Sequence, residues 1–310
     1  MPMIGLGTWQ APKGECGAAI ISAVEAGYRH LDCAAAYGNE AEIGEAIAGL
    51  ISRGVVKRED LFITSKLWVH KARPEDCWAA LTKTLSDLRT SYVDLYLIHW
   101  PFSLAEGTPF PPTPESVIVY SPENYSALWK TLELEVDAGR VKALGCSNMS
   151  VTKMEALAPT TRHPICANQV ECHPSLPQNE LLAWCKSNGV ALVAYSPLGS
   201  PGRPPRWVKD DNSRPLEAPA VLRAASSLGM TPAQILIRFQ YQRGVIAIPK
   251  SANPARILDN LKAVAEGADL SDTIMDELKN LEVPDGRGRI ITGYPGVVSG
   301  RVQTWQELWT

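Results

Sequence analysis

Eight short apolar runs alternate with longer amphipathic stretches, and this alternation limits the possible fold more than any other feature of the chain. Near-continuous apolar runs are typical of parallel strands buried on both faces, and the stretches between them would be covering helices. We therefore predict an α/β protein, a (β/α)8 TIM barrel with extended loops at its C-terminal face. The apolar runs span residues 4–8, 30–33, 61–67, 93–99, 142–146, 165–170, 191–195 and 245–249.

The stretches between these runs carry helical signals. Ile43, Ile47 and Leu50 follow one another at spacings of four and three, which places them on one face of a helix. Thr231 is followed by a proline and by Gln234, a combination typical of a capped helix start.

A doubly wound sheet is the alternative to a barrel. No GxGxxG motif follows the first apolar run, although GLGTW is rich in glycine, and this weakens a Rossmann interpretation. The 310 residues contain no obvious linker, and barrels reach comparable lengths as one unit. We therefore expect a single barrel domain over residues 1–310.

Three connections are longer than usual: residues 101–124, 198–219 and 282–310. Long irregular connections in compact domains are usually functional or disordered. The first two follow predicted strands, so in a barrel they would lie at the face where the strands end.

Composition excludes several classes of partner. The 30 basic and 33 acidic residues give a net charge of −3, which provides no field for nucleic acid or an anionic membrane. No apolar run reaches the roughly 20 residues that span a bilayer.

The first residues, MPMIGLGTWQ, lack the pattern of a signal peptide, and the seven cysteines form no CxxC pair. We expect reduced cysteines, no metal, and a cytoplasmic monomer; a removed organellar transit peptide would also agree with the sequence.

Polar residues gather at the ends of seven predicted strands. In a barrel these ends converge on one mouth, where catalytic residues lie. The residues are Asp32, Lys66, His99, Ser147 with Asn148, Gln169, Tyr195 with Ser196, and Lys250 with Ser251.

Asp32 and Lys66 would enter an otherwise apolar barrel, where a buried charge needs a partner, so we expect an ion pair between them. Tyr37 lies five residues after Asp32 and could lean over the mouth. An adjacent ammonium should lower the pKa of its phenol from about 10 towards neutrality, which suits a general acid. A Schiff-base aldolase using Lys66 is the alternative, and it would need a lysine free of Asp32.

Several long motifs resemble those of the aldo-keto reductase superfamily. They run in order from about residue 4 to residue 281, and they look closest to the aldose and aldehyde reductase branch, with a plant-like character in CAAAYGNE and QELW. The resemblance implies NADPH-dependent reduction of aldehydes or ketones, with sugars and uronates among the candidates, by hydride transfer from nicotinamide. The motifs are GYRHLDCAAAYGNEAEIGEAI, VDLYLIHWP, GCSNMS, NQVECHP, YSPLGSPGRP and IPKSANPARILDN.

The resemblance implies that Asp32, Tyr37, Lys66 and His99 form the catalytic set. Tyr37 would donate the proton, while a neutral His99 would orient the substrate carbonyl. Steroid double-bond reductases of the family have glutamate at the position of His99, so this histidine favours carbonyl reduction.

The resemblance also implies a set of cofactor-binding residues. Independently, Asn253-Pro254 predicts a helix start with Arg256 in its first turn, and a helix start beside basic residues is an anion site. NADPH is therefore expected over NADH. The implied set is Thr8, Trp9, Ser147, Asn148, Gln169, Tyr195, Ser196, Leu198, Ser200, Lys250, Ser251, Arg256 and Asn260.

Aromatic residues are expected to line the substrate pocket beside His99. Trp9, Trp68 and Trp100 match aromatic pocket positions of the family, and Trp305 of the tail is a further candidate. Aromatic walls supply apolar area with few polar demands, which fits a broad range of aldehydes or ketones.

Two departures from the family pattern concern the cofactor. Several aldose reductases clasp the pyrophosphate with an aspartate and a lysine, and those positions are Gly202 and Gln10 here. We expect faster cofactor exchange than in clasped relatives. A catalytically silent NADPH-binding regulatory or structural barrel protein is the alternative function, and the matched pair of Tyr37 and Lys66 argues against it.

Overall fold

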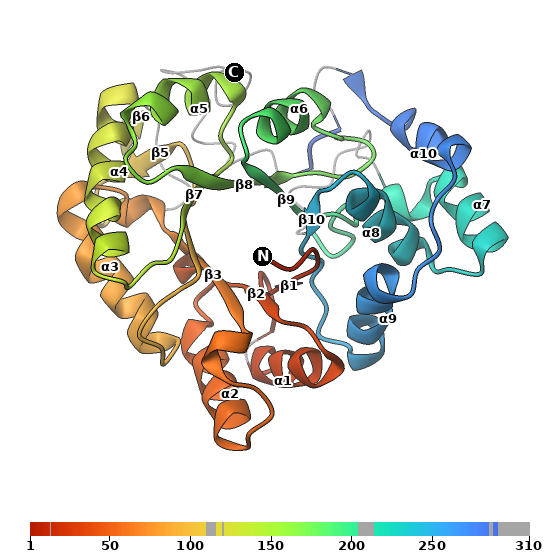
Figure 1. The fold of residues 1–310 in the computed structure, drawn as a ribbon, viewed down its shortest axis with the longest axis horizontal. Helices are drawn as coiled ribbons and strands as arrows, with labels where there is room; N and C mark the ends of the chain where they lie inside the picture. Colours follow the sequence, from red (N-terminus) through yellow and green to blue (C-terminus); the bar gives the residue numbers. More distant parts are fainter. Residues whose placement is uncertain (13, 110–115, 120, 204–213, 285–287, 291–310) are drawn as a thin grey trace.

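The structure is a computed structural model that describes residues 1–12, 14–109, 116–119, 121–203, 214–284 and 288–290 (Figure 1). Trp305 therefore lies outside the described residues.

Eight parallel strands form the centre of the molecule, and they follow one another around a ring in chain order (Figure 1). The ring closes between its first and last strands, where Gly5 N–H donates to the carbonyl of Ala247 at 2.9 Å. Gly7 N–H donates to the carbonyl of Pro249 at 3.0 Å. The predicted barrel is confirmed, and the doubly wound alternative is wrong. The strands are β1 (Leu6–Gly7), β2 (His30–Asp32), β3 (Phe62–Leu67), β4 (Leu95–Ile98), β7 (Leu144–Ser147), β8 (Ile165–Glu171), β9 (Ala191–Tyr195) and β10 (Ile246–Ala247).

Helices cover the outside of the ring (Figure 1). The covering helices are α1 (Cys16–Ala26), α2 (Glu40–Ser52), α3 (Pro74–Asp87), α4 (Pro122–Asp137), α5 (Val151–Leu157), α6 (Asn179–Ser187), α8 (Pro232–Gln242) and α9 (Pro254–Ala265). Two further helices, α7 (Pro219–Leu228) and α10 (Asp272–Lys279), pack with α8 around a separate buried cluster that includes Val221, Phe239 and Leu278.

The long connection after β4 contains a small hairpin. Its strands are β5 (Phe102–Leu104) and β6 (Val117–Val119), which pair antiparallel. The predicted extended loop is thus partly ordered by its own backbone hydrogen bonds.

The helical signals in the sequence correspond to real helices. Ile43, Ile47 and Leu50 are all buried on α2. Thr231 and Gln234 form the expected capping box: Gln234 N–H donates to the Thr231 hydroxyl at 3.2 Å, and Thr231 N–H donates to the Gln234 side chain at 2.8 Å.

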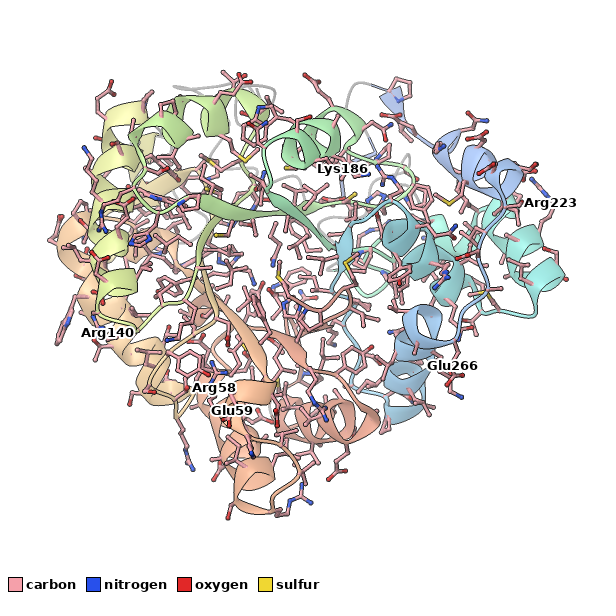
Figure 2. The ribbon with its side chains drawn as sticks, viewed as in Figure 1. Arg58, Glu59, Arg140, Lys186, Arg223 and Glu266 are labelled. Atoms are coloured by element: carbon pink, nitrogen blue, oxygen red, sulfur yellow. The ribbon has the colours of Figure 1, made fainter. Side chains whose placement is uncertain are left out.

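Apolar side chains fill the inside of the barrel. Figure 2 shows side chains occupying the ring, whereas labelled charged residues such as Arg223 and Glu266 lie at the periphery. Leu97, Val193 and Ile246 belong to this inner cluster. Gly145 on β7 is required by the tight packing, because a Cβ there would lie 2.6 Å from both a side-chain carbon of Leu97 and the neighbouring strand's backbone.

The cysteines are unpaired, as the sequence predicts, and all except Cys166 are buried. Among the described residues, no helix is long and apolar enough to cross a membrane.

One buried carboxylate lies between the barrel and its covering helices. Glu40 begins α2, and its side chain accepts hydrogen bonds from Ser65 at 2.5 Å and from Thr84 at 3.1 Å. Burial raises its pKa from an ordinary 4.5 to about 7, because desolvation outweighs the two hydroxyl donors that favour the charged form.

Replacing Glu40 by Gln should change how stability depends on pH. The folded state holds the proton more tightly than the unfolded chain, so Glu40 stabilises most below pH 4.5, and this contribution is lost as pH rises to about 7. Between pH 4.5 and pH 7 the parent should therefore lose about 2–3 kcal/mol of unfolding free energy because of Glu40, and the variant should lack this loss. Denaturant titrations at several pH values measure this difference, and parallel curves for the two proteins would contradict it.

Candidate active site

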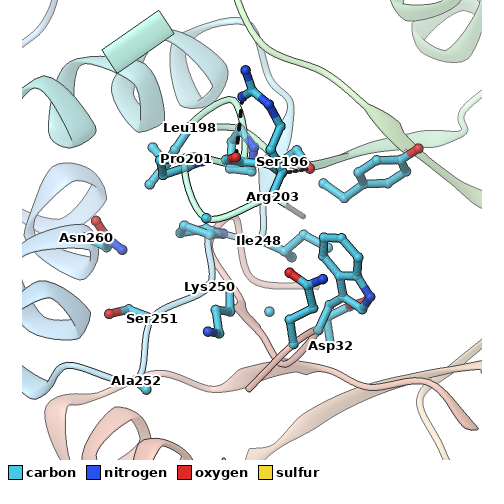
Figure 3. A pocket seen from close by; sticks show the side chains of 18 of the residues that line it. Asp32, Ser196, Leu198, Pro201, Arg203, Ile248, Lys250, Ser251, Ala252 and Asn260 are labelled. Atoms are coloured by element: carbon cyan, nitrogen blue, oxygen red, sulfur yellow. Dashed lines mark hydrogen bonds between the residues drawn. The ribbon is translucent and has the colours of Figure 1, made fainter. Parts of the chain in front are cut away.

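A cavity of about 880 Å³ opens where the barrel strands end, and most of the predicted site residues line it (Figure 3). Six of the seven predicted strand ends contribute polar side chains to its lining, as expected for parallel strands closed into a ring. The predicted residues that line it are Trp9, Asp32, Tyr37, Trp68, His99, Trp100, Ser147, Asn148, Gln169, Tyr195, Ser196, Leu198, Ser200, Lys250, Ser251, Arg256 and Asn260.

A buried ion pair lies at the floor of the site. The ammonium of Lys66 on β3 donates to both carboxylate oxygens of Asp32 on β2, at 2.8 and 2.7 Å. It also donates to the carbonyl of Cys33 at 2.9 Å. Lys66 is fully buried and Asp32 is only 2% exposed, so neither charge has water as an adequate partner.

Neighbouring residues fix the carboxylate of this pair. The Gln169 amide on β8 donates to Asp32 at 2.7 Å from across the ring. The Thr8 hydroxyl donates at 2.8 Å to the backbone carbonyl of Asp32. Thr8 is buried and is not among the residues that line the cavity, and its contact with the cofactor stays a prediction.

Tyr37 reaches the ion pair from a single 3-10 turn, Ala35–Tyr37, that follows β2. This turn ends at Gly38, whose φ of 67° is in the left-handed region that glycine adopts readily. The Tyr37 hydroxyl lies 3.3 Å from the Lys66 ammonium, and the phenol ring is half-buried at the edge of the cavity.

His99, directly after β4, is enclosed by aromatic rings. Its ring centroid lies 5.1 Å from that of Trp68 and 5.9 Å from that of Tyr37. Burial holds the pKa of His99 well below its ordinary value, and the positive charge of Lys66 lowers it further. Its Nδ1 has no hydrogen-bond partner among the described residues. His99 is therefore a neutral imidazole.

A chain of amides and hydroxyls crosses the mouth beside His99. Asn148 donates to the carbonyl of His99 at 3.0 Å and accepts from the Tyr195 hydroxyl at 2.8 Å. Ser147 donates to the carbonyl of Gln169 at 2.8 Å. These contacts hold side chains from the ends of β7 and β9 in fixed positions around one part of the cavity.

The opposite part of the cavity is suited to an anion. Figure 3 shows Lys250, Ser251 and Asn260 on one side of the pocket, below the loop that carries Ser196 and Leu198. The same part includes Arg256 in the first turn of α9, a helix capped by the Asn253 side chain, which accepts from the Arg256 N–H at 3.1 Å. Within the described residues neither Lys250 nor Arg256 is paired with a carboxylate, so both positive charges remain available.

An aromatic wall lies next to the acid–base cluster. Trp100 packs in a cluster with Phe102 and Leu104 of the β5–β6 hairpin, and Trp9 and Trp68 contact this cluster. The extended loop after β4 therefore supports the predicted aromatic pocket.

Several cavity residues could not be identified from sequence reasoning. These are Arg203 and the start of α8 (residues 231–233). Gln10 and Gly202, which the resemblance places at the missing clasp, also line the cavity. The capped start at Thr231 did carry a signal, because barrel helices begin at the face where the strands end.

Lys66 does not line the cavity. Its ammonium is occupied by Asp32 and by the carbonyl of Cys33, which contradicts the free lysine that a Schiff-base aldolase would need.

Comparison with known proteins agrees with these observations. The chain matches the Aldo/keto reductase family over residues 3–282. It is 50% identical to mouse (Mus musculus) aldo-keto reductase family 1 member A1 over 84% of this chain and 81% of the mouse protein. It is 41% identical to the zebrafish (Danio rerio) family 1 member A1-A over 99% of this chain and 93% of that protein. The solved aldose reductase from Schistosoma japonicum superposes with a TM-score of 0.81 at 39% identity, covering 92% of this chain and 90% of that one.

The fold and the cluster of titratable groups at its mouth define a (β/α)8 barrel enzyme of the oxidoreductase class. More narrowly, the chain belongs to the aldo/keto reductase family.

Replacing Lys66 by Met should destabilise the protein strongly. The substitution leaves the Asp32 carboxylate buried without its ammonium partner, a situation that costs about 3–5 kcal/mol. Adding Asp32→Asn should restore part of this loss, so the double variant is more stable than the sum of the two single changes predicts. Denaturant unfolding of the four proteins measures the coupling, and simple additivity would argue against a dominant ion pair.

Proposed function

We propose that this protein reduces the carbonyl group of small aldehydes and ketones to an alcohol, using NADPH, with Tyr37 as the general acid. The single observation that carries this proposal is the Tyr37 hydroxyl 3.3 Å from the buried Lys66 ammonium, at the edge of a cavity whose other part is an anion site. The relatives named aldo-keto reductase and aldose reductase support a carbonyl substrate, with sugars and uronates among the candidates.

The donor set of the cavity fits a phosphorylated nicotinamide cofactor. One part offers a helix start, the Ser251 hydroxyl, and the positive charges of Lys250 and Arg256, which have no carboxylate partner among the described residues, and this set suits the 2′-phosphate. Asn260 lies nearby for the adenine. The other part offers the fixed hydroxyls and amides of Ser147, Asn148 and Gln169, which suit a carboxamide, and the ring of Tyr195, which suits stacking.

The loop after β9 would hold the pyrophosphate through Ser196, Leu198 and Ser200, and Trp9 would contact the cofactor from β1. When bound, the cofactor supplies the hydride that reaches the carbonyl carbon.

The chain itself controls the proton. Tyr37 donates its hydroxyl proton to the carbonyl oxygen as negative charge develops there. The Lys66 ammonium stabilises the phenolate that remains, and Asp32 keeps that ammonium in position. His99, being neutral, offers a ring nitrogen to orient the carbonyl without competing as an acid.

The substrate would lie against Trp9, Trp68 and Trp100. These rings provide an apolar surface beside His99 and make few polar demands on the substrate. We therefore expect aromatic and aliphatic carbonyl compounds of several shapes to be accepted.

The proposal is tested by following the absorbance of reduced nicotinamide with a panel of carbonyl compounds. The panel contains an aromatic aldehyde, a short aliphatic aldehyde, an aldose, a uronate, a dicarbonyl and a ketosteroid. Turnover with any of them supports the reductase. Tight NADPH binding without turnover would favour a silent nucleotide-binding barrel instead.

Changing Tyr37 to Phe should lower kcat about 10²- to 10⁴-fold, since the general acid is removed while the ring stays. NADPH affinity, measured by fluorescence titration, should stay within about twofold, because the phenol proton takes no part in binding. Tyr92→Phe is the matched control, since Tyr92 does not line the cavity. Retention of most turnover in the Tyr37 variant would overturn the assignment.

Changing Arg256 to Ala should raise the Kd for NADPH about 10- to 100-fold, through loss of charge-assisted hydrogen bonds to phosphate. The Kd for NADH should change far less, since NADH lacks the 2′-phosphate. Arg223→Ala, which removes an exposed arginine paired with Glu277, serves as the control. Equal losses for both cofactors in the Arg256 variant would place the phosphate site elsewhere.

The missing clasp bears on cofactor exchange. Gln10 and Gly202 both line the cavity and provide no opposite charges to close over the pyrophosphate. We infer that NADPH leaves this protein faster than it leaves relatives that have the aspartate and lysine.

A further inference from the structure

One buried carboxylate at the mouth has no part in the proposed proton transfer. Glu171 ends β8, two residues after Gln169, and its backbone pairs in register with Tyr195 on β9. Its side chain is fully buried, so its negative charge lowers the stability of the folded state unless nearby groups compensate it.

The partners of the Glu171 side chain come from two parts of the chain, the nearby residue His173 and the distant residues 289–290. The Ile290 N–H donates to its Oε1 at 2.7 Å, and His173 Nε2 lies 2.9 Å from the same oxygen. Burial by itself raises the pKa of Glu171, but the hydrogen bond and charge of His173 and the charge of Arg289 outweigh it, so the pKa lies below its ordinary value. Glu171 is therefore an anion that binds the backbone N–H of Ile290.

A second set of contacts holds the same stretch of chain. Val283 N–H donates to the carbonyl of Ser175 at 3.1 Å, just after β8. Gly288 passes so close to Ser175 that an added Cβ would lie 2.0 Å from its carbonyl oxygen. Residues 283 and 288–290 are thus packed on the connection that leaves β8, and Glu171 supplies the charged contact.

This anchoring brings an apolar side chain behind the aromatic wall. Ile290 is 1% exposed and belongs to the cluster formed by Val69, Trp100, Phe102 and Leu104. Trp100 lines the cavity, whereas neither Ile290 nor Glu171 does. Ile290 therefore lies outside the cavity lining but in the same apolar cluster as Trp100.

We propose that Glu171 is a positioning residue that fixes Ile290 in the apolar cluster that contains Trp100 and thereby sets the selectivity of the site for bulky over small carbonyl substrates. This inference rests on the proposed reductase function. It predicts an effect on substrate binding that is separate from the proton transfer assigned to Tyr37.

The test compares Glu171→Gln with Glu133→Gln. Glu133 on α4 is a matched control: it is also a buried carboxylate that accepts backbone N–H groups, from Arg162 at 2.5 Å and His163 at 2.8 Å, and it does not line the cavity. Both variants lose a buried charge that binds backbone, so a general loss of stability should appear in both. An effect of positioning residues at the mouth should appear only in Glu171→Gln.

The expected result is a change in KM that depends on substrate size. Glu171→Gln should raise KM about tenfold for an aromatic aldehyde and less than about twofold for a short aliphatic aldehyde, with kcat and NADPH affinity nearly unchanged. Glu133→Gln should leave both KM values unchanged. A folded Glu171 variant with parental KM values, or one in which kcat alone falls, overturns the proposal.

A second variant shows whether Glu171 acts through Ile290. Ile290→Ala should produce the same size-dependent rise in KM, and combining it with Glu171→Gln should add little. Fully additive effects overturn the proposal. If Glu171→Gln fails to fold, unchanged selectivity in Ile290→Ala overturns it equally.

Amide hydrogen exchange separates this inference from the proposed function. The backbone N–H of Ile290 should lose protection in Glu171→Gln and keep it in Glu133→Gln, whether or not any carbonyl compound is reduced. If the parent protein reduces no substrate, the proposed function fails, and exchange still decides whether Glu171 holds Ile290. Unchanged protection in the Glu171 variant overturns the anchoring itself.

Discussion

The buried ion pair between Lys66 and Asp32 is the interaction on which the rest of the site depends. An ammonium and a carboxylate inside an apolar barrel are tolerable only when each neutralises the other and when further hydrogen bonds complete their shells. The carbonyl of Cys33 and the amide of Gln169 supply those bonds. The position of Lys66 is therefore fixed, and its ammonium lies 3.3 Å from the Tyr37 hydroxyl.

Three of the buried carboxylates of the described barrel lie in different environments. Asp32 faces an ammonium, Glu171 faces His173 and the charge of Arg289, and Glu40 has two hydroxyl donors. Burial dominates for Glu40, whose pKa rises to about 7, whereas charged partners outweigh burial for Glu171. The residue type alone does not determine what a buried carboxylate does; its partners do.

The two parts of the cavity differ in whether their charged groups have partners of opposite charge. Near β2 and β3 the charges are balanced internally, and His99 is kept neutral by burial and by Lys66. Near α9, Lys250 and Arg256 lack carboxylate partners within the described chain and lie beside a helix start. A long molecule with a negatively charged end and a neutral end would suit this cavity, because its negative charge would meet a positive charge only near α9.

The sequence by itself determined the eight strands, their closure into a barrel and the set of polar side chains at one mouth. Apolar runs of strand length can be covered only in a few ways, and the ends of parallel strands must share one face. Local capping was also readable, as at Thr231, since it depends on residues only three positions apart.

Contacts between distant segments were decided only by the tertiary structure. The Thr8 hydroxyl bonds to β2 instead of facing the cavity, Arg203 reaches the cavity lining, and Glu171 binds the backbone of Ile290, which lies 119 positions later in the chain. No local pattern specifies such pairs, because their geometry follows from how loops pack over a closed ring. The sequence thus predicts which residues reach the mouth, whereas packing decides which of them touch.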